Sequence, residues 1–244
     1  MVLDLNTAEY AAYADALSAA PGVGEVARLG GATCLVVRGL GSRVFNRVLD
    51  LGSTDALDDI AAFYAGEPWW VSDTRGLGPE LEERGFVPDY GWMKFSRGVS
   101  PRQARSELDV RLVGREAADD FARVVLDGYD LPDWTAPLAA SLVGRAGWSC
   151  YVAYAGREPA GAGALFVHEG TGWLGYAATR ARFRGRGAQS AILAARIEDA
   201  RRQGCTTVVT ETGEAQQGRP SSSYRNILRA GFREAGVRAN YRAP

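Results

Sequence analysis

Hydrophobic and polar residues recur along the chain with two different periods, and together they predict a mixed series of helices and strands. Helical spacing of alanine and other apolar residues covers residues 7–20 and ends at Pro21-Gly22. The longest helical segment, Ala188–Gln203, is followed by Gly204, which is typical of a helix C-terminus. Further helices are expected over Thr54–Ala65, Pro79–Arg84, Arg115–Asp127, Ala136–Val143 and Ser222–Ala230.

Strands are predicted where short runs alternate apolar and polar residues or are rich in β-branched residues. Thr206–Thr210 alternates only weakly, which predicts a strand buried on both faces. The other predicted strands are Ala32–Arg38, Asn46–Leu51, Trp69–Ser72, Trp92–Phe95, Leu108–Val113, Ser149–Tyr154, Gly161–Val167, Thr171–Thr179 and a closing strand after Gly231-Phe232. This order of elements places the chain in the α/β class, with a mixed α+β sheet.

The two halves of the chain end in a similar way. Each has a short helix, a Gly-Phe pair, a variable segment and an aromatic strand, and the pairs Gly85-Phe86 and Gly231-Phe232 lie 146 residues apart. We interpret this as a weak internal duplication with a shorter N-terminal copy. A polar stretch without apolar periodicity separates the copies. We therefore expect an N-terminal domain over residues 1–97, a linker over 98–107 and a C-terminal domain over 108–244.

Composition removes several classes of chemistry. Of the 28 basic residues, 27 are arginine, so that Lys94 is the only lysine, and His168 is the only histidine. A zinc site of several histidines is thereby excluded, a Ser-His-Asp mechanism would need His168, and a Schiff base would need Lys94. The three cysteines form no C-x-x-C motif. We expect no metal and no disulfide framework.

Charge and hydropathy also limit the partners and the compartment. The net charge is −1, which gives no reason to expect a nucleic-acid partner. The first residues lack the basic start of a signal peptide, and no apolar run approaches the 18 residues of a membrane span. These features predict a soluble cytoplasmic protein without a membrane partner.

The segment Thr179–Ser190, TRARFRGRGAQS, combines arginine and glycine between a predicted strand and a long predicted helix. The first turn of a helix has unpaired N–H groups and a partial positive charge, and glycines let the backbone approach an anion closely. The segment therefore predicts a pyrophosphate site, and a solvated basic turn is the alternative. A G-x-G-x-x-A string at Gly22, Gly24 and Ala27 follows a helix rather than a strand, so it does not predict a dinucleotide site.

Arg184-Gly185-Arg186-Gly187-Ala188-Gln189 resembles the R/Q-x-x-G-x-G/A signature of the GNAT N-acetyltransferase superfamily. The order of elements around it agrees over residues 107–244, and the first hundred residues resemble the degenerate half of tandem members. The resemblance implies a GNAT-like acyltransferase fold in two halves and acetyl-CoA as co-substrate. It implies cofactor contacts from the signature and from the end of the preceding strand, namely Ala177, Ala178, Thr179, Arg184, Gly185, Arg186, Gly187, Ala188, Gln189 and Ser190.

The sequence departs from the family pattern at two places. Gln189 replaces the last Gly or Ala of the signature, and Ile227 occupies the position of the tyrosine that commonly protonates the leaving thiolate. Tyr224, one turn earlier, is our candidate for that acid, and packing in the core is the alternative. Glu211, at the end of the Thr206–Thr210 strand, is the candidate general base, or else it pairs with an arginine.

The acceptor pocket is predicted from the loop after the first helix of the second half. Tyr129, Asp130 and Trp134 are expected to border it, and loop acids that are merely solvated are the alternative. The resulting prediction is an N-acyltransferase that moves acetyl from acetyl-CoA to a small-molecule amine by direct attack in a ternary complex. A non-catalytic CoA-binding or partner-binding module is the alternative. Three roles stay open for the N-terminal half, which are lining the pocket, holding the C-terminal domain or forming a homodimer.

Overall fold

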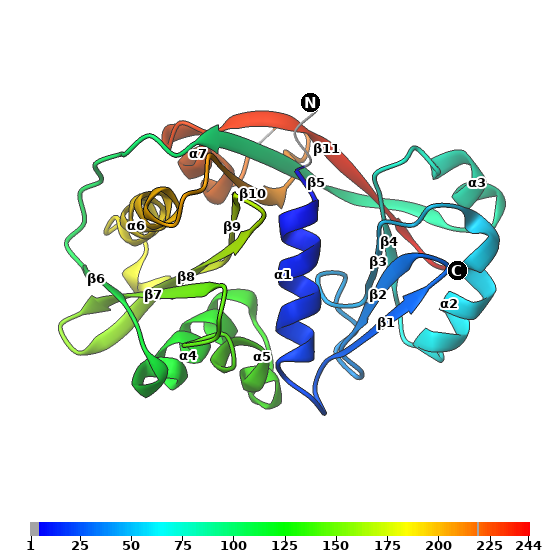
Figure 1. Ribbon diagram of the computed structural model, residues 1–244, viewed down its shortest axis with the longest axis horizontal. Coiled ribbons are helices and arrows are strands. Elements are labelled where there is room, and N and C mark those ends of the chain that lie inside the picture. Colours follow the sequence, from blue (N-terminus) through cyan, green and yellow to red (C-terminus); the bar gives the residue numbers. More distant parts are fainter. Residues whose placement is uncertain (1–4, 219) are drawn as a thin grey trace.

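One mixed sheet of eleven strands runs through the part of the chain described by the computed structural model, residues 5–218 and 220–244 (Figure 1). Its strands are β1 (Glu25–Leu29), β2 (Ala32–Val36), β3 (Arg47–Leu49), β4 (Trp70–Asp73), β5 (Val87–Gly98), β6 (Asp109–Leu112), β7 (Trp148–Ala155), β8 (Glu158–His168), β9 (Thr171–Thr179), β10 (Thr207–Gly213) and β11 (Arg233–Arg242). The helices are α1 (Thr7–Ser18), α2 (Leu57–Tyr64), α3 (Gly78–Glu83), α4 (Ala118–Tyr129), α5 (Ala136–Ala140), α6 (Ala188–Arg202) and α7 (Ser222–Arg229).

Two strands differ from the prediction made from the sequence pattern: one was not predicted, and the other is longer than predicted. β1 lies in a segment for which no strand was expected, and it pairs with the whole of β2 as an antiparallel hairpin. β5 was expected only over Trp92–Phe95 but extends over twelve residues, because β10 and β11 pair with its two edges. Its last residue, Gly98, was assigned to the linker and instead belongs to the strand, whereas residues 99–108 contain no helix or strand.

The sheet joins the two halves by an exchange of strands. Along the sheet the order is β1-β2-β3-β4-β11-β5-β10-β9-β8-β7-β6. β11, from the second half, therefore lies between β4 and β5, and β5, from the first half, lies between β11 and β10. Each half thus contributes one strand to the other, and the hydrogen-bonded ladder is continuous between them.

The two exchanged strands follow the two Gly-Phe pairs of the internal repeat. β5 and β11 are antiparallel, with Val87 opposite Arg242 and Ser96 opposite Arg233. A shift of 146 residues takes Val87 to Arg233 and Ser96 to Arg242, so the repeat offset maps this pair of strands onto itself. The register therefore has the local two-fold symmetry expected if the two halves arose by duplication.

Helix α1 lies between the two halves (Figure 1). Its buried residues, which include Ala12, Ala16 and Leu17, share one apolar core with Leu35 of the first half and Phe121 of the second. Helices α4 and α6 cover opposite sides of β7–β9 (Figure 1). Since this core is continuous across both halves, α1 fixes the position of one half against the other.

Strands β9 and β10 are parallel, and they separate after a short paired segment. Their pairing covers Thr171–Trp173 and Thr207–Val209. Just beyond, β9 bulges against β8, because Ala162 pairs with Ala178 while Ala164 pairs with Gly175. Tyr176, in the bulge, has a φ of +49°. The split and the bulge leave the far edge of β9 free of a neighbouring strand.

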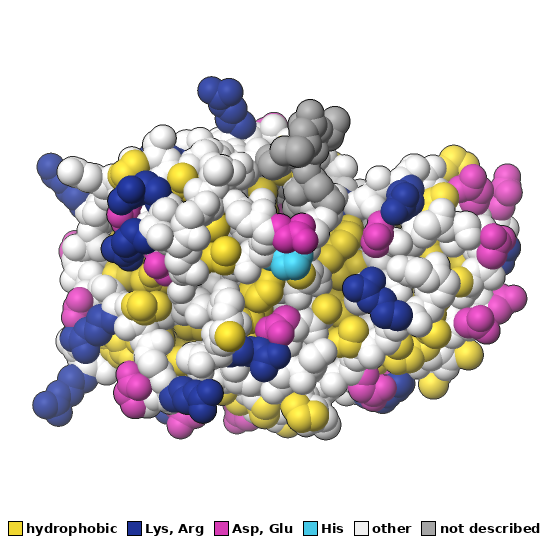
Figure 2. Space-filling view, in the orientation of Figure 1, with side chains coloured by type: hydrophobic (Ala, Val, Ile, Leu, Met, Phe, Trp, Pro, Cys, Tyr) yellow, Lys and Arg dark blue, Asp and Glu magenta, His cyan; other side chains and the backbone are white. Residues whose placement is uncertain are grey.

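The visible surface carries charges of both signs. On the face in Figure 2, basic and acidic side chains are mixed over the C-terminal half, and acidic side chains gather at the outer end of the N-terminal half. That end consists of α2 and α3, whose exposed acids include Asp58, Asp59, Glu80, Glu82 and Glu83. No helix among residues 5–218 and 220–244 has the length and apolar character needed to cross a membrane.

Candidate functional site

Two adjoining spaces open where β9 and β10 separate. The first, called here the groove, has a volume of about 600 Å³ and lies between the end of β9, the start of α6 and helix α7. The second, the inner cavity, has a volume of about 230 Å³ and lies deeper, toward α1. Four residues line both spaces, namely Gly128, Ala177, Gln189 and Ser223. A single ligand can therefore extend from the groove into the inner cavity.

The signature segment forms the floor of the groove. Gly185 and Gly187 have φ values of +80° and +82°, which residues with a side chain rarely adopt. Gly187 is the N-cap of α6, and a Cβ placed there would lie 2.6 Å from the carbonyl oxygen of Arg105. No side chain caps this end of the helix, so its first N–H groups are available to a ligand. The two glycines thus expose the positive end of α6 to the groove.

Of the predicted cofactor residues, all except Arg186 line the groove. The Arg186 guanidinium instead forms an ion pair with Glu107 (Nε–Oε2 3.2 Å), and its carbonyl accepts hydrogen bonds from the linker residues Ser106 and Glu107. The Arg186 side chain therefore pairs with the linker rather than lining the groove, and a cofactor contact from its backbone amide stays a prediction. The linker braces the loop from outside.

The charge of the groove favours an anion. None of the fifteen described residues that line it is acidic. Arg184 lies on one side and Arg229, from α7, on the other. Arg229 also donates a 2.7 Å hydrogen bond to Asn226, which holds its guanidinium at the groove. Two guanidinium groups and a helix N-terminus are a good match for a pyrophosphate.

The end of β9 supplies an extended backbone along the groove. Ala177, Ala178 and Thr179, which the family resemblance implies as cofactor contacts, line it, and β10 no longer pairs with them. Gly128 of α4 lies against this edge, since a Cβ there would come within 2.3 Å of Ala178 Cβ. Free backbone amides at a strand edge can bind an extended amide-containing chain by strand addition.

Gln189, the departure from the signature, belongs to a chain of polar side chains at the junction of the two spaces. Asn226 Nδ2 donates to Gln189 Oε1 (2.6 Å), and Gln189 Nε2 donates to Ser223 Oγ (3.1 Å). Ser223 lies one helical turn before Ile227 on α7, and both line the inner cavity. The glutamine is therefore a link that orients the Ser223 hydroxyl.

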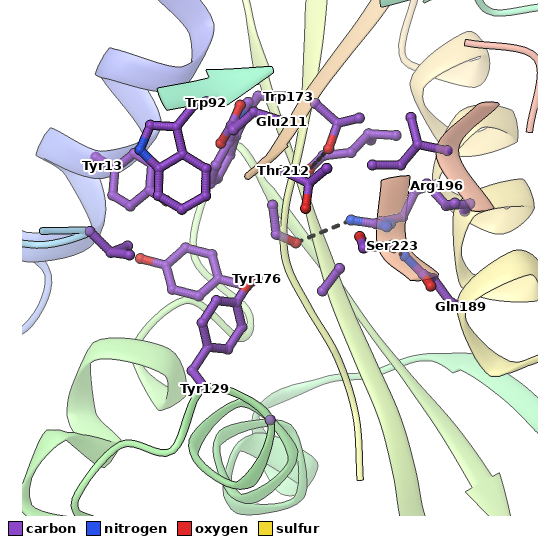
Figure 3. Close-up of a pocket in the computed structure, with 18 residues that line it drawn as sticks. Tyr13, Trp92, Tyr129, Trp173, Tyr176, Gln189, Arg196, Glu211, Thr212 and Ser223 are labelled. Atoms are coloured by element: carbon purple, nitrogen blue, oxygen red, sulfur yellow. Dashed lines mark hydrogen bonds between the residues drawn. The ribbon is translucent and has the colours of Figure 1, made fainter. Parts of the chain in front are cut away.

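The inner cavity has aromatic side chains on one side and polar side chains on the other. Figure 3 shows the rings of Tyr13, Trp92 and Tyr176 on the side of α1 and β5, with Gln189, Arg196 and Ser223 opposite. Tyr13 and Trp92 come from the N-terminal half, as does Val44. Of the three roles left open for that half, the structure thus shows that it lines the cavity.

Glu211 lies in the wall of the inner cavity and belongs to a buried ion-pair network. The register between β10 and β5 places it directly opposite Lys94, whose Nζ lies 2.9 Å from Glu211 Oε2. Trp173 Nε1 also donates to the carboxylate (3.2 Å). The alternative role predicted for Glu211 was an ion pair with an arginine. The structure shows an ion pair, but its partner is Lys94, the single lysine of the chain.

The network continues to Glu9 of α1, which is fully buried. Glu9 accepts hydrogen bonds from Lys94, Arg47 (2.9 Å) and Arg238 (2.7 and 3.0 Å). Burial alone would raise the pKa of Glu9, but the charges of Arg238, Lys94 and Arg47 lower it well below its usual value. Glu9 thus stays ionised and ties four elements from both halves together.

Arg196 is a further buried cation at the cavity, and no sequence motif marks it. It is only 1% exposed, and it donates to the carbonyls of Ala164 (2.9 Å) and Gly175 (3.1 Å), which the β9 bulge leaves free. Gly163 makes room for it, because a Cβ there would come within 3.0 Å of the guanidinium carbon. Burial lowers the pKa of Arg196 to about 10, and no carboxylate among the described residues pairs with it.

The structure does not bring Tyr224 to the site. Its ring is buried edge-on against Phe95, and its hydroxyl donates to Glu234 Oε1 (2.7 Å). Burial and this bond raise the pKa of Tyr224 to about 12. Tyr224 lines neither space, whereas Ile227 does line the inner cavity. The alternative interpretation, packing in the core, describes Tyr224 as the structure has it.

Only one of the three predicted acceptor residues reaches the inner cavity. Tyr129 lines it, with its hydroxyl beside the backbone amide of Ala177, and burial raises its pKa to about 12. Asp130 caps the end of α4 and is exposed, and Trp134 is 47% exposed. Neither lines the groove or the inner cavity. Helix α4 ends at Tyr129, and Asp130 and Trp134, which follow it, lie toward solvent.

The residues that sequence reasoning missed come from distant segments. No local motif marks these residues, which are Tyr13, Trp92, Lys94 and Arg196. The sequence gives only their positions on predicted helices and strands, and these positions do not show that the four side chains meet at one site. The one usable signal was Lys94, a charged residue within the predicted strand Trp92–Phe95, whose other residues are aromatic or apolar. Among residues 5–218 and 220–244, no three His, Cys, Asp or Glu side chains come together as a metal site would require.

Residues 117–219 match the acetyltransferase (GNAT) family. No curated protein matches the chain in sequence. Among solved structures, a GCN5-related N-acetyltransferase from Kribbella flavida covers 99% of this chain and 97% of its own at 15% identity, with a TM-score of 0.64. A tandem GNAT protein from the clavulanic acid biosynthesis pathway covers 92% of this chain and 84% of its own at 13% identity, with a TM-score of 0.61.

A GNAT-family acetyltransferase from Novosphingobium aromaticivorans, itself described as putative, covers 88% of this chain and 87% of its own at 12% identity, with a TM-score of 0.59. At these identities the likeness establishes the fold. The predicted fold class, α/β with a GNAT-like arrangement in two halves, is confirmed.

Proposed function

We propose that this protein transfers an acetyl group from acetyl-CoA to the amine of a small molecule, with both substrates bound together. The observation that carries the proposal is the continuity of the groove with the inner cavity at Ala177, Gln189 and Ser223. The groove has the donors for a pyrophosphate and an extended amide chain, and the inner cavity has room for an acceptor. A thioester at the junction would face both.

The residues of the groove fit acetyl-CoA, which supplies a thioester as an activated acetyl group. The backbone amides of Gly185–Ser190, with Arg184 and Arg229, would hold the pyrophosphate. Ala177–Thr179 would bind the pantetheine amides as an added strand would, and their N–H groups would polarise the thioester carbonyl. This assignment uses every predicted cofactor residue, with Arg186 contributing only its backbone amide, since its side chain pairs with Glu107.

The inner cavity would position the amine. Glu211 is the one carboxylate among the described residues that line it, so it is the candidate to accept the proton that the amine must lose. The amine nitrogen then bonds to the thioester carbonyl carbon, and the carbon–sulfur bond breaks with the electron pair on sulfur. Uptake of a proton completes free CoA. Lys94 and Trp173 keep the Glu211 carboxylate oriented toward this end of the cavity.

Ser223 would take the place of the tyrosine that Ile227 replaces. Its oxygen already accepts a hydrogen bond from Gln189, and no described residue accepts its proton. A hydroxyl has one donor, so this proton can point into the junction toward the leaving sulfur. Ser223 would stabilise the thiolate as a hydrogen-bond donor, with Gln189 and Asn226 as positioning residues.

A non-catalytic CoA-binding module is the second candidate. The observation that favours it is the orientation of Tyr224, which is turned away toward Glu234 while Ile227 faces the cavity. The two candidates make the same prediction for cofactor binding but differ in turnover. They can therefore be separated by one pair of measurements.

Thermal unfolding with acetyl-CoA, followed by free-thiol release with a panel of amines, tests the proposal. At a concentration about 100 times Kd, ligand binding stabilises by roughly 2.7 kcal/mol, and a rise in Tm of about 5 °C or more is expected. Thiol release supports the enzyme, and stabilisation without release from any amine supports the module. No stabilisation at millimolar acetyl-CoA would refute both.

Variants locate the binding site. The double variant Arg184→Ala, Gly187→Glu is expected to lose stabilisation by acetyl-CoA, because it removes a guanidinium and places a carboxylate at the helix N-terminus. Arg201→Ala is the matched control, since this exposed arginine lies at the other end of α6 and pairs with Glu198. Loss of binding in the control as well would show that the effect is not local.

A further inference from the structure

The aromatic wall of the inner cavity is assembled from separate elements. Tyr13 of α1 lies 5.2 Å from Trp173 of β9 and 6.2 Å from Tyr176, measured between ring centroids. Trp173 and Tyr176 lie 6.0 Å apart. Trp92 of β5 stands on the same side (Figure 3). A wall of four rings is complementary to a flat, apolar body, because aromatic rings pack well edge to face and in offset stacks.

Two polar atoms in this wall have no partner. Trp92 Nε1 and the Tyr176 hydroxyl are both inaccessible to solvent, and no described residue forms a hydrogen bond with either. Tyr176 as a whole is nine-tenths or more buried. An indole N–H can only donate, so a group that satisfies it must carry an acceptor such as an oxygen. Because an unpaired buried donor is costly, the cavity favours an acceptor substrate with oxygen at this end.

The charges around the cavity have a positive excess. Two carboxylates, Glu9 and Glu211, lie in the network that reaches its wall. Three cations pair with them, namely Arg47, Lys94 and Arg238, and a fourth, Arg196, lines the opposite side of the cavity. Arg47 lies 4.2 Å from the ring centroid of Tyr13, which itself lines the cavity. Of these six groups only Glu211 and Arg196 line the cavity itself, so the excess of two positive charges lies partly behind its wall and acts on a ligand through space.

This excess decides between two kinds of amine. A polyamine, or any acceptor with a second cationic group, would bring like charge into a poorly hydrated space. An acceptor with a carboxylate would be attracted and would also supply the oxygen that Trp92 and Tyr176 lack. The ring wall, the unpartnered donors and the charge therefore point to the same ligand.

We infer that the acceptor is a primary amine on an aromatic body that also carries a carboxylate, as in an aromatic amino acid. The inference rests on the proposed function, since it assigns the occupant of that same inner cavity. The rings would hold the body and the excess positive charge would hold the carboxylate. Because Trp92 Nε1 is closed to solvent in the free protein, a rotation of the indole on binding would bring it to donate to one of the carboxylate oxygens. The amine would then face Glu211 and the junction.

Binding of acetylated products tests this without requiring turnover. Isothermal titration in the presence of CoA would compare N-acetylphenylalanine, N-acetylphenethylamine, which lacks the carboxylate, and N-acetylalanine, which lacks the ring. None of the three has a titrating amine, so differences report the body and the carboxylate alone. N-acetylphenylalanine is expected to bind about tenfold or more tightly than either of the others.

The results divide cleanly. Equal or tighter binding of N-acetylphenethylamine would overturn the carboxylate, equal or tighter binding of N-acetylalanine would overturn the aromatic body, and no binding of N-acetylphenylalanine would overturn the inference as a whole. Thiol release only with amines other than aromatic amines that carry a carboxylate would leave the proposed function standing and would refute this inference. Failure of CoA itself to bind would instead refute the proposed function.

A substitution that keeps the ring isolates the donor. Trp92→Phe removes Nε1 and is expected to weaken N-acetylphenylalanine several-fold while changing N-acetylphenethylamine little. Trp134→Phe is the matched control, because Trp134 is exposed and lines neither the groove nor the inner cavity. An equal loss for both ligands in Trp92→Phe would mean that the indole acts only as packing, and that its N–H takes no part in recognition.

Discussion

Replacing Glu9 with glutamine is the sharpest test of how the two halves are held together. Glu9→Gln keeps the shape of the side chain but removes its charge. In the native protein the carboxylate is 0% exposed and accepts hydrogen bonds from Arg47, Lys94 and Arg238. After the substitution, three buried cations share the single carboxylate of Glu211.

The expected cost follows from that imbalance. Removing one member of a buried ion pair typically costs about 3–5 kcal/mol, because a charge is left uncompensated in a poorly hydrated interior. This is a large part of the roughly 5–15 kcal/mol by which domains are stable. With a urea slope of about 3 kcal/mol/M, the unfolding midpoint would fall by about 1–2 M. Equilibrium urea unfolding monitored by tryptophan fluorescence measures it.

The control is an exposed carboxylate with similar hydrogen bonding. Glu25 forms a 2.7 Å ion pair with Arg38, and both side chains are largely exposed to solvent. Glu25→Gln is expected to change stability by less than about 1 kcal/mol, as is usual for surface pairs. A loss for Glu9→Gln no larger than that of the control would refute the reasoning, since burial would then confer no special cost.

The pH dependence gives an independent check with a definite sign. The folded pKa of Glu9 is lowered well below 4.5, so its contribution is fully present above the unfolded value near 4.5 and is lost as pH falls through the folded pKa. The difference in unfolding free energy between the native protein and Glu9→Gln is therefore expected to be constant from pH 5 to 8. It should shrink only below about pH 4.5.

Three further predictions concern the site. Gly187→Ala should weaken acetyl-CoA binding about tenfold, because φ is +82° and the new Cβ would meet Arg105, and a Kd measured by titration tests this. Ser223→Ala should lower kcat about 10–100-fold with little change in the Kd of acetyl-CoA, with partial rescue by Ser223→Thr, and unchanged kcat would remove Ser223 from the mechanism. Tyr224→Phe should leave kcat and its pH profile unchanged. It should lower the unfolding free energy by about 1 kcal/mol, because the hydrogen bond to Glu234 is lost. A shifted pH profile of kcat would contradict a purely structural role for Tyr224.

The groove could be predicted from the sequence because its determinants are local. Gly185 and Gly187 lie in one short segment between a strand and a helix, and the unusual backbone they adopt depends on their own chemistry. The same holds for Ala177–Thr179, which end the strand just before it. The side chain of Arg186 could not be placed from the sequence, because its partner Glu107 lies 79 residues away in the linker.

The inner cavity could not be predicted in the same way, because strand pairing creates it. Lys94 faces Glu211 only through the register of β5 with β10, which is itself a result of the strand exchange. Tyr13 reaches the cavity because α1 lies between the halves, and no periodicity reveals which half a helix will contact. Tyr224 had the right residue type and helix, but the side chain turns to the opposite side, toward Phe95.

The exchange of β5 and β11 has a consequence for synthesis on the ribosome. β4 and β5 are made in the first half of translation, yet the strand that pairs with β4 on one side and β5 on the other is β11. Until β11 emerges, both strands present unpaired edges, which are prone to pair with other chains. The nascent N-terminal half is thus expected to stay dependent on chaperones through most of translation, and a nick in residues 99–106 of the finished protein should leave two fragments that remain associated.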